Sequence, residues 1–145
     1  MIWLLRHGDA EDGSPDAERR LTAKGERQAS AAAGALGALG VKLDACLTSP
    51  RVRAADTARL ACAGQGVEPQ VEERLSGGPF DPIELALGLG DEVLLVGHEP
   101  DFSDAIARVT GARAKLKKGG LAAIADGELH LLVRPAELKA MARGI

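Results

Sequence analysis

Short apolar runs recur along the first two-thirds of the chain, and each is followed by a polar or amphipathic segment. Residues 2–5, 45–48 and 92–96 have the length and composition of buried strands, and the last of these runs is the strongest. Residues 67–71 form a weaker strand candidate. The pattern therefore predicts several short buried strands separated by helices and loops.

The segments between these runs have helical composition and recognisable helix starts. After a polar, acidic loop at residues 8–20, Thr22 is placed to cap an Ala-rich helix that reaches about residue 39. Ser49 followed by Pro50 predicts a second start, with Ser at the N-cap and Pro at the first helical position, where its missing N–H is not needed. The predicted helices cover residues 22–39, 50–61, 82–89 and 101–109.

The last part of the chain has the pattern of a hairpin followed by a helix. Residues 121–125 and 129–133 are apolar runs on either side of an Asp-Gly-Glu turn, and Asp-Gly between apolar runs is a strong hairpin signal. Pro135 then opens a short final helix. Strands that alternate with helices imply a parallel sheet covered on both faces. We therefore expect an α/β fold, a three-layer α/β/α sandwich with a mostly parallel sheet and one antiparallel edge strand.

Composition and charge restrict the classes of function. The 145 residues are the usual length of one domain, which is predicted to span residues 1–145. Aromatic residues make up only 2% and the net charge is −3, which argues against nucleic acid or an anionic membrane as the main partner. The apolar start, residues 1–5, is too short for a signal peptide or a membrane span, so the expected location is the cytoplasm.

The two cysteines and a group of lysines have ordinary structural interpretations. Cys46 and Cys62 lie among apolar residues at a spacing typical of neither zinc nor redox sites, and both are predicted to be small buried hydrophobes without a disulfide. Lysines at positions 115, 117 and 118 are expected to form a solvated face. The alternative for these lysines is a surface that docks an acidic partner.

Three polar clusters each follow directly after a predicted strand. They are Arg6-His7-Gly8 after the first strand, Ser49-Pro50-Arg51-Val52-Arg53 after the second, and Gly97-His98-Glu99 after the strongest. The carboxyl ends of parallel strands lie along one edge of a sheet, where α/β proteins bind their ligands. Two histidines and two or three arginines from distant parts of the chain are therefore expected to converge at this edge.

Such a set of side chains is suited to a phosphoryl group. Arginine is permanently charged, and its planar fork matches phosphate oxygens. A neutral imidazole can attack phosphorus to form a phosphohistidine, and a second imidazole, if protonated, stabilises charge on the phosphate oxygens. Gly8 would let the backbone approach the phosphate, and the helix start after Ser49 adds N–H donors. No acidic cluster with metal-ligand spacing accompanies these groups, so neither a metal nor another cofactor is expected.

These clusters extend into three motifs that resemble a known family. The motifs are Leu5-Arg6-His7-Gly8-Asp9-Ala10, the LTSPRVRAADTA run at residues 47–58, and Val96-Gly97-His98-Glu99-Pro100. Together and in this order they resemble the histidine phosphatase superfamily, in the branch with the RHG motif. The short chain and the RRLTAKG segment at residues 19–25 are similar to its SixA-type phosphohistidine phosphatases. The resemblance covers essentially the whole chain and implies a phosphoglycerate-mutase-like fold.

The resemblance also implies a role for each matched residue. His7 would be the nucleophile and Arg6 would bind the phosphate, with Gly8 beside it. The arginine of the family's R-A-x-x-T pattern falls on Arg53, and the second active-site histidine falls on His98.

Two further arginines are candidates for substrate contact. Arg51 competes with Arg53 for the same role, but two residues apart on a helix the side chains would point about 200° apart, so only one should reach the phosphate. We favour Arg53. Arg19 matches a further arginine of the SixA branch and is expected to touch the substrate.

One departure from the larger family members bears on the substrate. Those members carry a Glu, thought to protonate the leaving oxygen, in a segment after the third strand, and residues 72–82 lack that pattern, as the SixA branch does. A weak or absent general acid suits a good leaving group, such as an imidazole, better than a sugar alcohol. The short chain also leaves little sequence for a lid over a small substrate. We therefore expect a phosphohistidine phosphatase acting on a protein such as a histidine phosphotransfer-type domain.

Three alternatives remain open at this level. A phosphatase of small phosphorylated substrates could use the same fold and the same residues. A non-catalytic phosphohistidine-binding module is a second alternative, although the complete set of histidines and arginines does not favour it. A phosphoglycerate mutase is weaker, because the chain lacks the extra sequence with which those enzymes enclose a small substrate.

Overall fold

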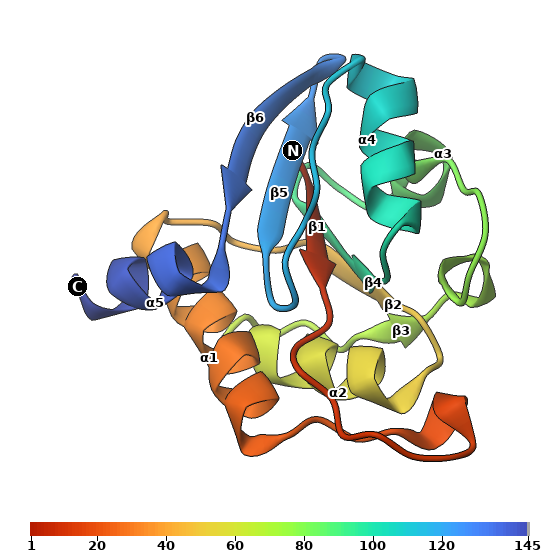
Figure 1. Ribbon diagram of the computed structural model, residues 1–145. Coiled ribbons are helices and arrows are strands. Elements are labelled where there is room, and N and C mark those ends of the chain that lie inside the picture. Colours follow the sequence, from red (N-terminus) through yellow and green to blue (C-terminus); the bar gives the residue numbers. More distant parts are fainter. Residues whose placement is uncertain (145) are drawn as a thin grey trace.

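One six-stranded sheet runs through the computed structural model, which describes residues 1–144 (Figure 1). Ile145, the last residue of the predicted domain, lies outside the described residues. The sheet has the order β3-β2-β4-β1-β5-β6. Its strands are β1 (Ile2–Arg6), β2 (Ala45–Thr48), β3 (Gln70–Val71), β4 (Val93–Gly97), β5 (Leu121–Ala125) and β6 (Glu128–Val133).

The sheet is mostly parallel, as predicted. Strands β1 to β4 all run in the same direction, and β5 is antiparallel to both of its neighbours, β1 and β6. The hairpin of β5 and β6 forms one edge of the sheet, so the antiparallel strand is second from that edge. Asp126 and Gly127 form the turn with φ of 53° and 72°, the left-handed conformations that a two-residue hairpin turn requires.

Helices cover both faces of the sheet, which confirms the three-layer α/β/α class (Figure 1). Helices α1 (Ala23–Ala38), α2 (Val52–Ala61) and α5 (Pro135–Arg143) pack on one face, and α3 (Pro82–Ala86) and α4 (Asp101–Thr110) pack on the other. Short 3₁₀ turns η1 (Asp16–Glu18) and η2 (Glu73–Leu75) interrupt two loops and were not predicted. None of the helices in residues 1–144 has the length and apolar character that a membrane span requires.

The central strand β4 explains why the sheet must be covered on both faces. Its residues Leu94 and Val96 pack toward α1, α2 and α5, whereas Val93 and Leu95 pack toward α3 and α4. All four side chains are almost completely buried, which is typical of a parallel strand inside an α/β protein. The predicted burial of both cysteines is confirmed, and both are free thiols.

The strand register brings the chemical motifs to one edge. Arg6 at the end of β1 lies opposite Gly97 of β4, and Thr48 at the end of β2 lies opposite Val96. The backbone N–H of His7 then donates to the Gly97 carbonyl at 3.1 Å, one step beyond the last paired residue of β1. The three chain segments that follow β1, β2 and β4 are therefore neighbours, as the parallel-sheet argument predicted.

Helix starts and ends were predicted with mixed success. Thr22 is the N-cap of α1 and accepts the Gly25 N–H at 3.0 Å, as expected. The prediction for Ser49 is wrong: α2 begins at Val52 with Arg51 at the N-cap, and Ser49 lies two residues earlier, where its hydroxyl is bonded to a histidine at the carboxyl ends of the strands. The weak strand shrinks to β3, and α3 ends three residues earlier than expected.

Candidate active site

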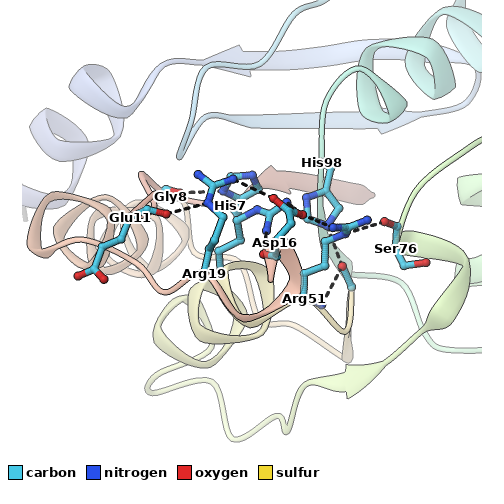
Figure 2. Close-up of polar contacts among 10 residues, drawn as sticks. His7, Gly8, Glu11, Asp16, Arg19, Arg51, Ser76 and His98 are labelled. Atoms are coloured by element: carbon cyan, nitrogen blue, oxygen red, sulfur yellow. Dashed lines mark hydrogen bonds and ion pairs between the residues drawn. The ribbon is translucent and has the colours of Figure 1, made fainter. Parts of the chain in front are cut away.

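Two histidines lie next to each other at the carboxyl ends of β1 and β4. The ring centroids of His7 and His98 are 5.2 Å apart, with the ring planes tilted by 57° (Figure 2). Only 7% of His7 and 8% of His98 is exposed. The two imidazoles are thus largely desolvated where β1 and β4 end.

The hydrogen bond of His7 fixes which ring nitrogen carries the proton. Its Nδ1 lies 2.8 Å from the Gly8 carbonyl oxygen, and a carbonyl can only accept. Nδ1 therefore donates, and in the neutral ring the lone pair is left on Nε2. An unprotonated Nε2 is the nitrogen that a nucleophilic histidine needs.

Both histidines are held in the neutral form when no ligand is bound. Burial, together with the positive charges of Arg53 and Arg6, lowers the pKa of His7 to about 4, although the bond to the Gly8 carbonyl works against this. Burial, His7 and the nearby arginines lower the pKa of His98 to about 3. A dianionic phosphate between the rings would raise both pKa values, so a protonated His98 belongs to the ligand-bound site.

Ser49 holds His98 in place. The Ser49 hydroxyl lies 2.7 Å from Nε2 of His98 and accepts the backbone N–H of Arg51 at 3.2 Å. Ser49 therefore orients the second histidine and also accepts a backbone N–H just before α2.

A cluster of three arginines surrounds the carboxylate of Asp16, which comes from η1 (Figure 2). Arg53 donates to the Asp16 carbonyl at 2.9 Å and to its Oδ2 at 3.1 Å. Arg19 donates to Oδ1 at 3.1 Å, and Arg51 also binds Oδ2. Hydrogen bonds from Arg19 and Arg53 lower the pKa of the Asp16 carboxyl, so it is ionised at neutral pH.

The predicted separation of Arg51 from Arg53 is wrong. Arg51 is not in the helix: its backbone is extended, with φ −64° and ψ 136°, so the helical geometry assumed for the pair does not apply. Both guanidinium groups reach the same Asp16 oxygen. Arg51 also donates to the Ser76 carbonyl at 2.9 Å and is one-third exposed, whereas the side chain of Arg53 is only 9% exposed.

Two arginines present buried donors that have no partner within residues 1–144. These donors are the Nε groups of Arg6 and Arg53. Buried N–H groups are almost always hydrogen-bonded in folded proteins, so an unpaired guanidinium donor at a sheet edge suits an anionic ligand.

Arg6 is held by a chain of bonds that starts at Glu99. The Glu99 carboxylate accepts the backbone N–H of Ser103 at 2.7 Å and that of Leu116 at 3.0 Å. The Leu116 carbonyl in turn accepts from Arg6 at 2.9 Å. Burial lowers the pKa of Arg6, and the charge of Glu99 opposes that shift. Glu99 was part of a sequence motif without an assigned role, and its role here is to position Arg6.

Gly8 is required by packing, a reason additional to the approach to phosphate that the sequence suggests. A Cβ at Gly8 would lie 2.6 Å from the Gly25 carbonyl oxygen of α1. The Gly8 N–H donates to the Thr57 hydroxyl at 3.1 Å, and that hydroxyl donates to the Arg53 carbonyl at 2.7 Å. Gly8 therefore lets the loop after His7 pack directly against two helices.

Asp16 is the residue that sequence reasoning missed. It lies in a polar loop outside all three motifs, and nothing in its local pattern marks it. The sequence shows an acidic residue at position 16 and arginines at positions 19, 51 and 53. It does not show how the loop folds to bring Asp16 to these arginines. Within residues 1–144, no group of three or more His, Cys, Asp or Glu side chains is arranged to hold a metal ion.

Comparison with known proteins gives this geometry a family. A sequence profile of the histidine phosphatase superfamily (branch 1) matches residues 2–84, more than half of the chain. The chain belongs to the histidine phosphatase superfamily. The matched range contains Arg6, His7 and Arg53. A protein of uncharacterised function from Picosynechococcus sp. is 35% identical, over 92% of this chain and 96% of that relative.

Solved structures of several phosphatases have the same fold. The protein histidine phosphatase SixA complexed with tungstate has a TM-score of 0.81 at 22% identity, covering 95% of this chain and 99% of that chain. A candidate phosphohistidine phosphatase SixA from Nakamurella multipartitia has a TM-score of 0.77 at 27% identity, covering 92% and 95%. The α-ribazole phosphatase from Shigella flexneri has a TM-score of 0.71 at 21% identity, again covering 92% and 95%. The SixA-type resemblance is therefore confirmed, and phosphatases of small esters share the fold.

Proposed function

We propose that residues 1–145 act as one histidine phosphatase domain, which hydrolyses phosphohistidine on a cytoplasmic protein such as a histidine phosphotransfer-type domain. One observation carries this proposal: His7 has its Nδ1 proton committed to the Gly8 carbonyl, so its Nε2 lone pair is free beside His98. The low pKa of His7 supports the same role, because the ring is neutral at physiological pH when the substrate arrives.

The first step transfers the phosphoryl group to the enzyme. Nε2 of His7 attacks phosphorus while the bond between phosphorus and the substrate's imidazole nitrogen breaks. The substrate imidazole leaves with a proton taken from solvent. Arg6 and Arg53 donate to the phosphate oxygens through their unpaired Nε–H groups, and His98, protonated by the approach of the anion, donates a further hydrogen bond.

The second step returns the enzyme to its starting state. A water molecule attacks phosphorus, the bond to Nε2 of His7 breaks, and inorganic phosphate leaves with the protons of the water. The bond between Nδ1 of His7 and the Gly8 carbonyl holds the ring in one orientation through both steps.

The state of Asp16 supports a substrate with a good leaving group. Asp16 is the carboxylate bonded to Arg53, and its hydrogen bonds with arginines lower its pKa. It therefore lacks the proton that an alkoxide leaving group would need. An imidazole leaves without such help, which favours phosphohistidine over sugar phosphates.

The test is a substrate comparison in which phosphate release is measured. The wild-type protein is given a phosphohistidine-bearing carrier domain and a sugar phosphate, beside the His7→Ala variant as control. We expect kcat/KM for the carrier to exceed that for the sugar phosphate by at least about 100-fold, the usual contribution of a general acid. The variant should release nothing from either substrate.

Two results would overturn the proposal. A sugar phosphate hydrolysed much faster than the carrier would make the chain a phosphatase of small esters. Tight binding of the carrier by the folded wild type, with no phosphate release, would make it a binding module.

A further inference from the structure

A basic groove lies beside the proposed catalytic residues. It has a volume of about 530 Å³ and is formed by the end of β1, the first turns of α1, the segment before β5 and the start of α5. Five cationic side chains and one carboxylate line it. They are Arg6, Lys24, Lys117, Lys118, Arg134 and Asp9.

Two lysines of this groove, Lys117 and Lys118, lie in a turn that is hydrogen-bonded to the backbone of the nucleophile. The Gly119 N–H donates to the carbonyl oxygens of both Arg6 and His7, at 3.1 and 3.0 Å. The Gly120 N–H closes the turn by donating to the Lys117 carbonyl at 2.7 Å. Gly119 has φ of 77°, and a Cβ there would meet the side chain of Gln28 at 2.8 Å, so the turn is pressed against α1. The positions of Lys117 and Lys118 are thereby tied to that of His7.

Much of the positive charge in the groove is not neutralised. Oδ1 of Asp9 lies 3.6 Å from Nζ of Lys118, and a hydrogen bond from Thr22 lowers the pKa of this carboxylate, with help from the charge of Lys24. Arg134 pairs with Glu137. Lys24 and Lys117 have no carboxylate within ion-pair distance among residues 1–144, and both are exposed. The chain as a whole carries a net charge of −3, so this groove is a local basic surface on an acidic protein.

We propose that this groove docks carboxylate side chains that surround the phosphohistidine of a partner protein. The inference rests on the proposed function and adds the chemistry by which the partner is recognised. Arg6 lines the groove and directly precedes His7, so a partner whose phosphoryl group reaches His7 would place neighbouring Asp or Glu side chains against Lys24 and Lys117. Exposed lysines suit the surface of a protein partner, because such a surface brings several carboxylates at once. Their positive charge would also steer an acidic partner toward the site.

The test compares charge-reversed variants on two substrates. The variant Lys24→Glu/Lys117→Glu is assayed with a phosphohistidine-bearing carrier domain and with p-nitrophenyl phosphate, which carries no second anionic group. We expect the ratio of kcat/KM, carrier over p-nitrophenyl phosphate, to fall by at least about tenfold relative to the wild type. The wild-type ratio should also fall as salt is raised, and that of the variant should change less.

The matched control is Lys42→Glu/Lys115→Glu, which changes the net charge by the same amount. Lys115 is on the same segment as Lys117 but lines a separate hollow with Ser103 and Ala107. Lys42 precedes β2 and so lies at the amino ends of the parallel strands, whereas the histidines lie at their carboxyl ends. The control ratio should stay within twofold of the wild type.

The outcomes separate this inference from the proposed function. The docking role of the groove is overturned, and the proposed function is not, by either of two results. The wild type hydrolyses the carrier and the groove variant keeps the wild-type ratio of kcat/KM values, or the control variant loses as much of that ratio as the groove variant. A small bisphosphate is assayed as a third substrate. If the groove variant loses activity on the bisphosphate but not on the carrier, the groove binds a second anion of a small substrate, and docking of a protein is overturned. A wild type that fails to hydrolyse the carrier overturns the proposed function as well.

Discussion

At the scale of single residues, burial determines what the two histidines can do. His7 and His98 are both desolvated, and arginines lie close to each, so the unliganded site favours neutral rings. Neutrality makes His7 a nucleophile, whereas His98 needs the charge of the substrate before it can serve as a cation. Their hydrogen bonds differ as well: Nδ1 of His7 is bonded to the Gly8 carbonyl, whereas Nε2 of His98 is bonded to the Ser49 hydroxyl.

This desolvation predicts a pH-dependent stability. Because the pKa values of both histidines in the folded protein, about 4 and about 3, lie below the usual 6.5, the unfolded chain binds more protons between pH 6.5 and 3. Stability from this source is complete above pH 6.5 and is lost as the pH falls through that window. His98→Asn should therefore lose less stability than the wild type between pH 7 and 4.5, by on the order of 2 kcal/mol. Urea unfolding at the two pH values measures the difference, and equal losses would show that His98 is not desolvated.

Burial also predicts a ranking of the two competing arginines. Arg53 is buried beside both histidines and has an unpaired Nε–H, whereas Arg51 is partly exposed and anchored on Ser76. We expect Arg53→Ala to lower kcat/KM for p-nitrophenyl phosphate about 100-fold or more and Arg51→Ala about tenfold or less. Steady-state kinetics on the two purified variants gives the ranking, and the reverse order would move the phosphate contact to Arg51.

Some residues of the site could be predicted from the sequence and others could not. His7, His98, Arg6 and Arg53 could be placed together because each follows a strand, and parallel strands end at one edge. Asp16 could not, because its position depends on how a long polar loop folds back over the site. Ser49 has the local pattern of a helix cap, yet Arg51 is the N-cap of α2, and the Ser49 hydroxyl bonds both to His98 and to the Arg51 N–H.

At the scale of elements, the contact of α1 with the loop after β1 sets the position of the nucleophile. Gly8 and Gly25 meet almost backbone to backbone, and a Cβ on Gly25 would lie 2.0 Å from the Asp9 carbonyl oxygen. The sequence showed an Ala- and Gly-rich helix that could approach the sheet closely. It could not show that this helix touches the loop after His7, because that contact depends on tertiary packing.

The contact predicts that an alanine substitution at Gly25 lowers the stability of the protein, whereas one at Gly37 in the same helix raises it. Gly25→Ala should cost about 1–3 kcal/mol of stability, the usual range for overpacking, and should lower kcat by displacing the loop after His7. A Cβ on Gly37 meets nothing within 4 Å, so Gly37→Ala should instead gain about 0.4–1 kcal/mol. Thermal or urea unfolding of both variants gives the signs. A Gly25→Ala protein as stable as Gly37→Ala would mean that α1 does not approach the loop this closely.

At the scale of the whole molecule, strand order places the chemistry. The sheet order puts β1 next to β4, and β4 next to β2, so the three motifs lie side by side although up to 92 positions separate Arg6 from His98. The α/β class and most elements could be predicted because apolar runs and helix signals agree along the chain. The strand order, the loop over the arginines and the basic groove could not, because they depend on contacts between distant segments.

The most direct test of the whole account is to trap the phosphoryl group on the enzyme. The wild type is mixed with a phosphohistidine-bearing carrier, quenched in alkali within milliseconds to seconds, and mapped by peptide mass spectrometry, with His7→Ala as control. We predict a transient phosphoryl group on His7, formed and lost at rates that match turnover, and neither phosphoenzyme nor turnover in the variant. Turnover retained in His7→Ala, or a phosphoryl group found on another residue at the same rates, would contradict the assignment of His7 as the nucleophile.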